Sequence, residues 1–253
     1  MKPLQVLAAG SLRHVWPGVV SAFQHHYPAG IETQFGPAGI LRQRIEQGEA
    51  CDLFVSASIA HPQTLLQAGL AQRTGVFCHN FLCLNVRSDR VDSAADWLDL
   101  LRNPALRLAT STPGCDPCGD YAWQLFERIE QQETELGQRL KQRAMPLVGG
   151  KDSVPVPPGM QASVWLLKSG QADLFIGYHS YAHLLQANEG ITTLLIPEAW
   201  QTRADYGYAV CQPAGHKLAE LLLTCEGQEI FVKAGFGTIK TEGPDMSAPP
   251  VKH

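Results

Sequence analysis

Short apolar runs alternate with segments of helical periodicity along most of this chain. Three such pairs open it, with apolar runs at 4–8, 31–35 and 52–56 and helical segments at 11–26, 39–47 and 59–68. Serine or glycine stands at each junction, where a helix cap belongs. This alternation is typical of strands in a parallel sheet flanked by helices, so the sequence predicts an α/β fold.

A second set follows a long apolar run at 76–86, which exceeds one buried strand and is predicted to cross between two lobes. Its strands are expected at 107–109, 145–148, 173–177 and 191–196, and its helices at 94–101, 120–137, 159–169 and 180–188. A strand at 206–211 and helices at 217–224 and 227–234 are expected to return to the first lobe.

We therefore predict two lobes, each a mostly parallel sheet flanked by helices, joined by two crossover strands near residues 80 and 200. The first lobe takes residues 1–80 and 201–240, and the second takes residues 81–200. Residues 241–253, which have no periodicity, are expected to form a flexible tail.

Composition limits the class of protein. The 253 residues are 45% hydrophobic and 17% charged, which suits a folded chain with a substantial core. No stretch approaches the roughly 20 apolar residues of a membrane-spanning helix. The formal charge of −4, without a basic stripe, argues against nucleic acid or an anionic membrane as the partner. A bound anion would therefore be held by local dipoles.

Cysteine usage and the start of the chain leave the cellular compartment open. The seven cysteines are an odd number, so at least one thiol stays free unless it pairs between chains. That count favours a reducing compartment or cysteines buried as small apolar residues. A strand-like run directly follows Met1-Lys2-Pro3, which fits a cytoplasmic protein or an exported one written without its leader.

Small or polar turns stand where the predicted strands lead into helices. They are at 9–11, 36–39, 56–58, 115–119 and 157–160. In open α/β sheets, ligands bind at the carboxyl ends of the strands, where helix N-termini present unpaired N–H groups. Any one of these turns is explained by an ordinary helix cap. Together, facing each other from two lobes, they would form a cage of neutral donors for a tetrahedral anion.

Several of these segments carry a family resemblance. The sequences LAAGSL at 7–12, FGPAG at 35–39 and DLFVSA at 52–57 resemble, in order and spacing, the periplasmic molybdate-binding proteins of ABC importers. The sequence DPCG at 116–119 is similar to the molybdate/tungstate-binding branch, and KSGQAD at 168–173 and ADYG at 204–207 also fit. The likeness runs from about Leu4 to Phe236.

The resemblance implies a class II periplasmic-binding-protein fold that captures molybdate or tungstate between its lobes and delivers it to a membrane ABC permease. It implies a ligand set drawn from both lobes: Ser11, Ala38, Ser56, Ala57, Asp116, Cys118, Gly119, Met160 and Tyr178. It further implies a monomeric, non-enzymatic protein in the periplasm, with no cofactor and no metal beyond the bound oxyanion. A nucleic-acid partner is not expected.

Each side chain of this set has an implied role. Ser11 would donate its hydroxyl and N–H, the two alanines would donate backbone N–H groups, and Ser56 would lie beside the site. In the second lobe, Cys118 or Gly119 would offer an N–H. Met160 would cap the end of a helix that starts at Gly159, and the Tyr178 hydroxyl would close the cage.

The chain departs from the family pattern at two places. Pro37 and Ala38 stand where many bacterial members carry serines, so one hydroxyl and one N–H donor are absent. Asp116 matches one of the carboxylates that expand the metal coordination in the archaeal branch, but Gly177 stands where the second is expected. Sulfate, phosphate or a small carboxylate therefore remain alternative ligands, as does a role as a ligand-sensing effector domain.

Other features suggest different functions. Cys115 and Cys118 have the C-x-x-C spacing of a redox pair, and they could form a disulfide in an exported protein. His179 and His183 have a spacing that can chelate a metal, but no third ligand stands nearby. The chain carries no G-x-S-x-G, H-E-x-x-H or phosphate-loop motif, so nothing in it positively indicates catalysis.

Overall fold

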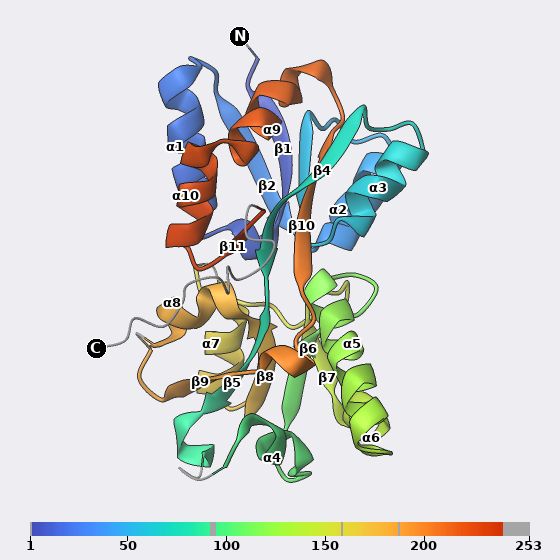
Figure 1. Cartoon of the computed structure of the whole chain (residues 1–253), viewed down its shortest axis with the longest axis vertical. Helices are drawn as coiled ribbons and strands as arrows, with labels where there is room; N and C mark the ends of the chain where they lie inside the picture. The colour runs from blue at the N-terminus through green and yellow to red at the C-terminus, as the bar shows by residue number, and fades with distance from the viewer. Residues whose placement is uncertain (1, 92–94, 158, 187, 240–253) are drawn as a thin grey trace, which may run out of the picture.

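The computed structural model describes residues 2–91, 95–157, 159–186 and 188–239, and within them the chain forms two β-sheets, each flanked by helices (Figure 1). The predicted tail at 241–253 lies outside these residues. No helix in the described ranges is both long and apolar enough to cross a membrane.

The first sheet has the strand order β11-β4-β10-β3-β1-β2. Its strands are β1 (Leu4–Ala9), β2 (Ile31–Gly36), β3 (Leu53–Ser56), β4 (Arg73–Asn80), β10 (Ala204–Val210) and β11 (Gly237–Thr238). β1 pairs parallel to both β2 and β3, whereas β10 runs antiparallel between β3 and β4. The three strands expected from the opening of the sequence therefore form one parallel unit whose carboxyl ends lie at the same edge.

Helices cover both faces of this sheet (Figure 1). One face carries α1 (Trp16–His26), α9 (His216–Leu223) and α10 (Cys225–Lys233), and the other carries α2 (Ala38–Glu46) and α3 (Ala60–Gln67). Every residue of β3 is buried, because a central strand covered on both faces exposes neither row of side chains.

The second sheet has the strand order β7-β6-β8-β5-β9. Its strands are β5 (Leu82–Arg87), β6 (Leu108–Ser111), β7 (Met145–Val148), β8 (Leu174–Tyr178) and β9 (Ile191–Leu195). Its helices are α4 (Trp97–Arg102), α5 (Pro117–Gln132), α6 (Leu136–Arg143), α7 (Ala162–Lys168) and α8 (Ala182–Gln186). β6 pairs parallel with β7 and β8, and β5 is antiparallel to its neighbours β8 and β9. The fold is thus the predicted two-lobed α/β arrangement of class II. Each sheet, however, is mixed and not mostly parallel as predicted, because β10 and β5 run antiparallel to their neighbours.

The long apolar run at 76–86 crosses between the sheets. It belongs to two strands, β4 in the first sheet and β5 in the second, with Phe81 between them. The chain returns after a short 3-10 helix at Glu198–Trp200, and β10 begins at Ala204. Near the first crossing, Gln201 donates from Nε2 to the carbonyl of Leu82 (2.8 Å), which ties the two crossing segments together.

The predicted helix at 120–137 is divided into two. α5 begins earlier, because Asp116 caps it and Pro117 occupies its first turn, where a missing N–H costs nothing. It ends at Gln132, and α6 starts after Glu135, whose φ of 69° turns the chain. A Cβ at Gly137 would lie 2.1 Å from the Phe126 carbonyl oxygen, so this close antiparallel packing of α6 on α5 requires glycine.

Candidate functional site

A cavity of about 650 Å³ lies between the two sheets, at the carboxyl ends of β1, β2, β6 and β8. Six predicted residues line it: Ser11, Ala38, Asp116, Cys118, Met160 and Tyr178. Ser56, Ala57 and Gly119, also predicted, do not. Turns far apart in sequence therefore meet at one site, and two of the five predicted turns contribute less than expected.

Ser11 lies in the short 3-10 helix (Gly10–Leu12) that directly follows β1. Its hydroxyl oxygen accepts a hydrogen bond from the buried Tyr206 hydroxyl, at 2.8 Å. Because a serine hydroxyl both accepts and donates, this contact holds the oxygen in place and leaves its proton for a ligand.

Ala38 is the first residue of α2, and Pro37 stands at the cap position without a side-chain hydrogen bond. The N-terminal end of this nine-residue helix faces the cavity, so its partial positive charge favours a bound anion. The next N–H, that of Gly39, donates instead to the carbonyl of Cys115 in the second lobe, at 3.0 Å. The two lobes are thus in direct backbone contact beside the cavity.

Asp116 both lines the cavity and caps α5, with Oδ1 accepting from the Cys118 N–H at 3.1 Å. Burial raises the pKa of the Asp116 carboxyl to about 6, although hydrogen bonds from Cys118 and Ser111 oppose the shift. As the pH falls through about 6 this carboxyl therefore takes up a proton, which removes its repulsion of an anion in the cavity.

Cys118 and Gly119 have N–H groups that already donate to Asp116, at 3.1 Å to its side chain and 2.9 Å to its carbonyl. The prediction that one of them serves a ligand gains no support from this arrangement. A Cβ at Gly119 would lie 2.5 Å from the Ser111 carbonyl oxygen, so Gly119 packs against the end of β6. Burial raises the pKa of the Cys118 thiol well above its ordinary value, which argues against a reactive thiolate at Cys118.

The Ser56–Ser58 turn is satisfied by the protein itself. The Ser56 hydroxyl donates to the Ser58 carbonyl at 2.7 Å and accepts from the Ser58 N–H at 3.1 Å. Tyr121 of α5 hydrogen-bonds to the Ser58 side chain from the other lobe. This turn therefore contributes to contact between the lobes and not to the lining of the cavity.

The structure differs from the prediction that Met160 caps a helix. The expected helix at Gly159 begins only at Ala162, and the Met160 N–H donates to the Pro157 carbonyl at 3.1 Å within the preceding turn. Met160 therefore does not cap a helix. Its side chain, 46% exposed, lies at the rim of the cavity.

Tyr178 ends β8 and is 4% exposed. Its hydroxyl oxygen is buried and has no hydrogen-bond partner among the described residues. A buried hydroxyl without a partner is costly, so this group is suited to a ligand in the cavity that it lines. Gly177 beside it is tightly packed, because a Cβ there would lie 3.0 Å from the Phe175 ring and 3.1 Å from Asn85 Nδ2, and both side chains would have to shift to accept it.

Tyr181 and His14 also line the cavity, although neither was predicted from the sequence as a ligand residue. The Tyr181 hydroxyl donates to the carbonyls of Ser11 (3.0 Å) and Gly10 (3.3 Å) across the two lobes. The His14 ring lies against the Tyr181 ring, with centroids 4.5 Å apart. Neither residue stands in a turn with ligand-like composition, so no pattern in the sequence could indicate them.

Asn80, at the first crossing, connects this site to both lobes. Its Nδ2 donates to Ser180 Oγ in the second lobe (2.9 Å) and to the Tyr206 hydroxyl in the first (3.3 Å). Tyr206 in turn donates to Ser11. A chain of hydrogen bonds thus runs from the crossing to the cavity.

Residues 4–237 match the family of bacterial extracellular solute-binding proteins. The chain belongs to this family.

Two relatives of known sequence are similar to this chain. It is 41% identical over 236 residues to an uncharacterised protein of Pasteurella multocida, covering 92% of this chain and 98% of the relative. It is 25% identical over 252 residues to the molybdate-binding protein of Escherichia coli, covering 94% and 89%. The chain therefore aligns with these relatives over nearly its whole length.

Solved structures share the fold. The periplasmic molybdate-binding protein of Azotobacter vinelandii aligns with a TM-score of 0.73 at 16% identity, over 92% of this chain and 98% of its own. The sulfate-binding protein of Mycobacterium tuberculosis aligns with a TM-score of 0.77 at 17% identity, over 95% and 88%. At such identities the likeness concerns the fold alone.

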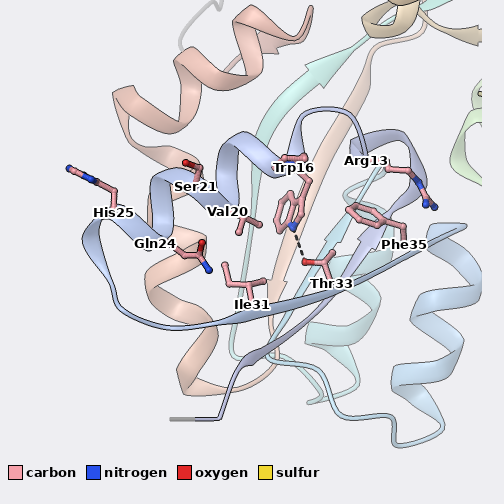
Figure 2. Close-up of a pocket in the computed structure, with 10 residues that line it drawn as sticks. Arg13, Trp16, Val20, Ser21, Gln24, His25, Ile31, Thr33 and Phe35 are labelled. Carbon is pink, nitrogen blue, oxygen red and sulfur yellow. Dashed lines mark hydrogen bonds between the residues drawn. The ribbon is translucent and has the colours of Figure 1, made fainter. Parts of the chain in front are cut away.

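A second hollow of about 770 Å³ lies on the outside of this solute-binding protein, between α1 and the edge strand β2 (Figure 2). Trp16 donates from its ring nitrogen to Thr33 Oγ1 at 2.8 Å, and Arg13 lies over the Phe35 ring at 4.9 Å (Figure 2). Among the described residues, those that line this hollow all belong to the first lobe. It therefore lacks the two-lobed contact by which solute-binding proteins enclose a ligand.

No group of three or more His, Cys, Asp or Glu side chains suited to a metal ion occurs in the part of the chain that the structure describes. The His183 side chain lies outside that part, so the His179–His183 spacing noted in the sequence stays untested.

Proposed function

We propose that this solute-binding protein captures a small oxyanion, molybdate or tungstate first, in the cavity between its lobes, without transforming it. Closure of the lobes would then present the loaded protein to a membrane permease of an ABC importer, on the periplasmic side. The proposal extends the family relationship to a specific ligand, partner and compartment.

The observation that carries the proposal is the buried Tyr178 hydroxyl, which has no hydrogen-bond partner among the described residues and belongs to a residue that lines the same cavity as Ser11 and the start of α2. These donors are neutral, and Arg13 is the cationic side chain among the cavity's described lining residues. Neutral donors and a helix N-terminus can stabilise a fully ionised anion while keeping its release reversible. The 25% identical molybdate-binding relative makes molybdate the first choice.

The size of the cavity favours a second candidate, an oxyanion that carries an organic body. A tetrahedral oxyanion displaces roughly two or three waters of about 30 Å³ each. The cavity of about 650 Å³ is several times larger, although the lobes already touch through Gly39 and Tyr181. Apolar side chains, including Phe35, Val148 and Phe175, line the remaining space. A phosphorylated hydroxy acid would fill more of it.

Thermal unfolding against a panel of anions distinguishes these ligands. Molybdate, tungstate, sulfate, phosphate and phospholactate are each added to the purified protein at matched ionic strength. A ligand present at 100 times its Kd adds about 2.7 kcal/mol to the free energy of unfolding. For a chain of this length that corresponds to a rise in Tm of about 5–10 °C. A rise with tungstate or molybdate alone supports the first candidate, and one with phospholactate alone supports the second. No response to any anion would refute the proposal.

A further inference from the structure

Two buried cysteines meet at the end of the first sheet that lies away from the cavity. Cys51 precedes β3 and is 5% exposed, and Cys211 follows β10 and is 8% exposed. β3 and β10 pair antiparallel, with Val210 opposite Leu53, so the start of one strand lies beside the end of the other. The two cysteines are thus neighbours in space although the whole second lobe separates them in the sequence.

The backbone geometry suits a covalent link between them. Cys211 donates its N–H to the Asp52 carbonyl at 3.0 Å, so it stands one residue out of register with Cys51. One residue of offset between strands about 4.8 Å apart places the two Cα atoms about 6 Å apart, within the usual range for a disulfide. Neighbouring residues of a regular strand point to opposite faces, so the link depends on Cys51 lying before β3, outside the regular strand. The side chains already contact each other through a hydrogen bond between the thiols.

A small reagent can reach this pair. Both cysteines line a cavity of about 470 Å³, together with Asp52 and Gln212. The hydrogen bond from Cys51 lowers the pKa of the Cys211 thiol, whereas that bond and burial raise the pKa of Cys51. Since the thiolate is the attacking species, Cys211 is the better nucleophile.

We propose that Cys51 and Cys211 form an intramolecular disulfide when the protein meets a low-molecular-weight disulfide such as oxidised glutathione. The Cys211 thiolate attacks one sulfur of glutathione disulfide, which forms a mixed disulfide and releases one glutathione thiolate. Cys51 then loses its proton and attacks the Cys211 sulfur, which forms the Cys51–Cys211 bond and releases the second glutathione. The two cysteines are oxidised by two electrons, and one glutathione disulfide is reduced to two thiols.

This bond would link the two segments of the first lobe that the second lobe interrupts. Residues 52–210 would lie within the closed loop, including both crossings. β10, which carries the chain back from the second lobe, would stay fixed to β3 while the lobes open and close. The bond lies at the far end of β3 from the anion cavity, so oxidation is expected to raise the Tm and leave ligand affinity unchanged.

Mass spectrometry of the full chain tests this inference. The reduced protein is freed of reductant, incubated with oxidised glutathione, alkylated to block remaining thiols and digested with trypsin. Tryptic peptides 45–73 and 204–217 each contain a single cysteine, Cys51 and Cys211 respectively. A linked pair of these two peptides, absent after reduction, is the expected result.

Two variants identify the order of attack. Cys51→Ser should trap a glutathione adduct on Cys211, because the second step has lost its thiol. Cys211→Ser should carry no adduct on Cys51. The matched control Cys225→Ser, which alters an exposed cysteine elsewhere, should form the linked peptides as the unaltered protein does.

Three results would overturn the inference: no linked peptides at full exposure to oxidised glutathione, a disulfide between Cys115 and Cys118 in their place, or an adduct on Cys51 in the Cys211→Ser variant. The readout requires no anion, so its failure would leave the proposed ligand untouched.

Discussion

At the scale of single residues, the cavity depends on hydroxyl groups held in place by neighbouring tyrosines. Tyr206 donates to Ser11, and Tyr181 donates to the carbonyls of Gly10 and Ser11. These contacts leave the Ser11 proton and the Tyr178 hydroxyl for a ligand. Pre-positioned donors lose little entropy when the ligand arrives, which favours tight binding by neutral groups.

Ser11→Ala removes one of these donors. We expect anion affinity to fall by about 1–3 kcal/mol, roughly 5- to 150-fold in Kd, because a desolvated anion is left short of one hydrogen bond. Isothermal titration calorimetry with the anion that gives the largest thermal shift measures the change. Ser21→Ala, on an exposed position of α1 outside the cavity lining, is the control and should bind normally. Equal affinity of Ser11→Ala and the unaltered protein would exclude Ser11 from the ligand set.

Asp116 should make anion binding depend on pH. Burial raises the pKa of this carboxyl to about 6, so its negative charge disappears as the pH falls through that value. We expect affinity for sulfate or tungstate to increase from pH 8 to pH 5. For folding, the sign is the same: the raised pKa contributes stability below the unfolded value near 3.8, and this is lost as pH rises through about 6.

Asp116→Asn tests this dependence, because asparagine keeps an oxygen that can cap α5 but carries no charge. The variant should bind the anion more tightly at pH 8 and lose most of the change between pH 8 and pH 5. His14 lines the same cavity and has an ionisable ring, so His14→Gln is measured in parallel. If His14→Gln removes the pH dependence and Asp116→Asn does not, the assignment to Asp116 is wrong.

At the scale of elements, the start of α2 and the loop before α5 meet so closely that one position admits only glycine. A Cβ at Gly39 would lie 2.7 Å from the Cys115 carbonyl oxygen and 3.1 Å from that of Gly114. This contact joins the two lobes beside the cavity, and it depends on the missing side chain.

Gly39→Ala should therefore hold the lobes apart without harming either one. Alanine stabilises a helix by about 1 kcal/mol relative to glycine, so the midpoint of urea unfolding should stay level or rise. Anion affinity should fall, because the clash raises the free energy of the closed state. Gly18→Ala, within α1 and away from the cavity, is the matched control and should leave affinity unchanged. A variant Gly39→Ala that binds normally would show that this contact does not contribute to closure.

At the scale of the whole molecule, the two lobes are joined by crossings that carry buried polar groups. Asn80 is 1% exposed, and its side chain contacts Ser180, Tyr206 and the backbone of Phe81. A buried amide that satisfies groups in both lobes specifies how the crossing is packed. It also links the crossing to Ser11 through Tyr206.

Asn80→Ala should lower the free energy of unfolding by about 2–4 kcal/mol, because it leaves buried partners without hydrogen bonds. Urea denaturation followed by tryptophan fluorescence measures this. Asn188→Ala, whose half-buried side chain donates to the Leu184 carbonyl four residues earlier, should cost under about 1 kcal/mol. A loss at Asn80 no larger than at Asn188 would contradict a specifying role for the crossing.

Local pattern was sufficient for much of this fold. The strands, the small turns at their carboxyl ends and the helices that follow were predicted from the period of apolar residues and from helix-cap chemistry. Both signals act over a few neighbouring positions. For the same reason the turns that contain Ser11, Ala38 and Asp116 could be located in advance, whereas the choice of these three residues as ligands came from the family resemblance. The break between α5 and α6 was missed, since it depends on close packing of Gly137 against Phe126 and not on a local signal.

Tertiary structure decided which of these turns serve the cavity. The Ser56–Ser58 turn resembles the Ser11 turn in sequence, but Tyr121 from the other lobe contacts it. In the turn before α5, Asp116 accepts hydrogen bonds from the N–H groups of Cys118 and Gly119, so these are not available to a ligand. Tyr181 and the Cys51–Cys211 contact depend on segments more than 100 residues apart in the chain. A donor's availability is set by whatever packs against it, and that neighbour is known only once both lobes are assembled.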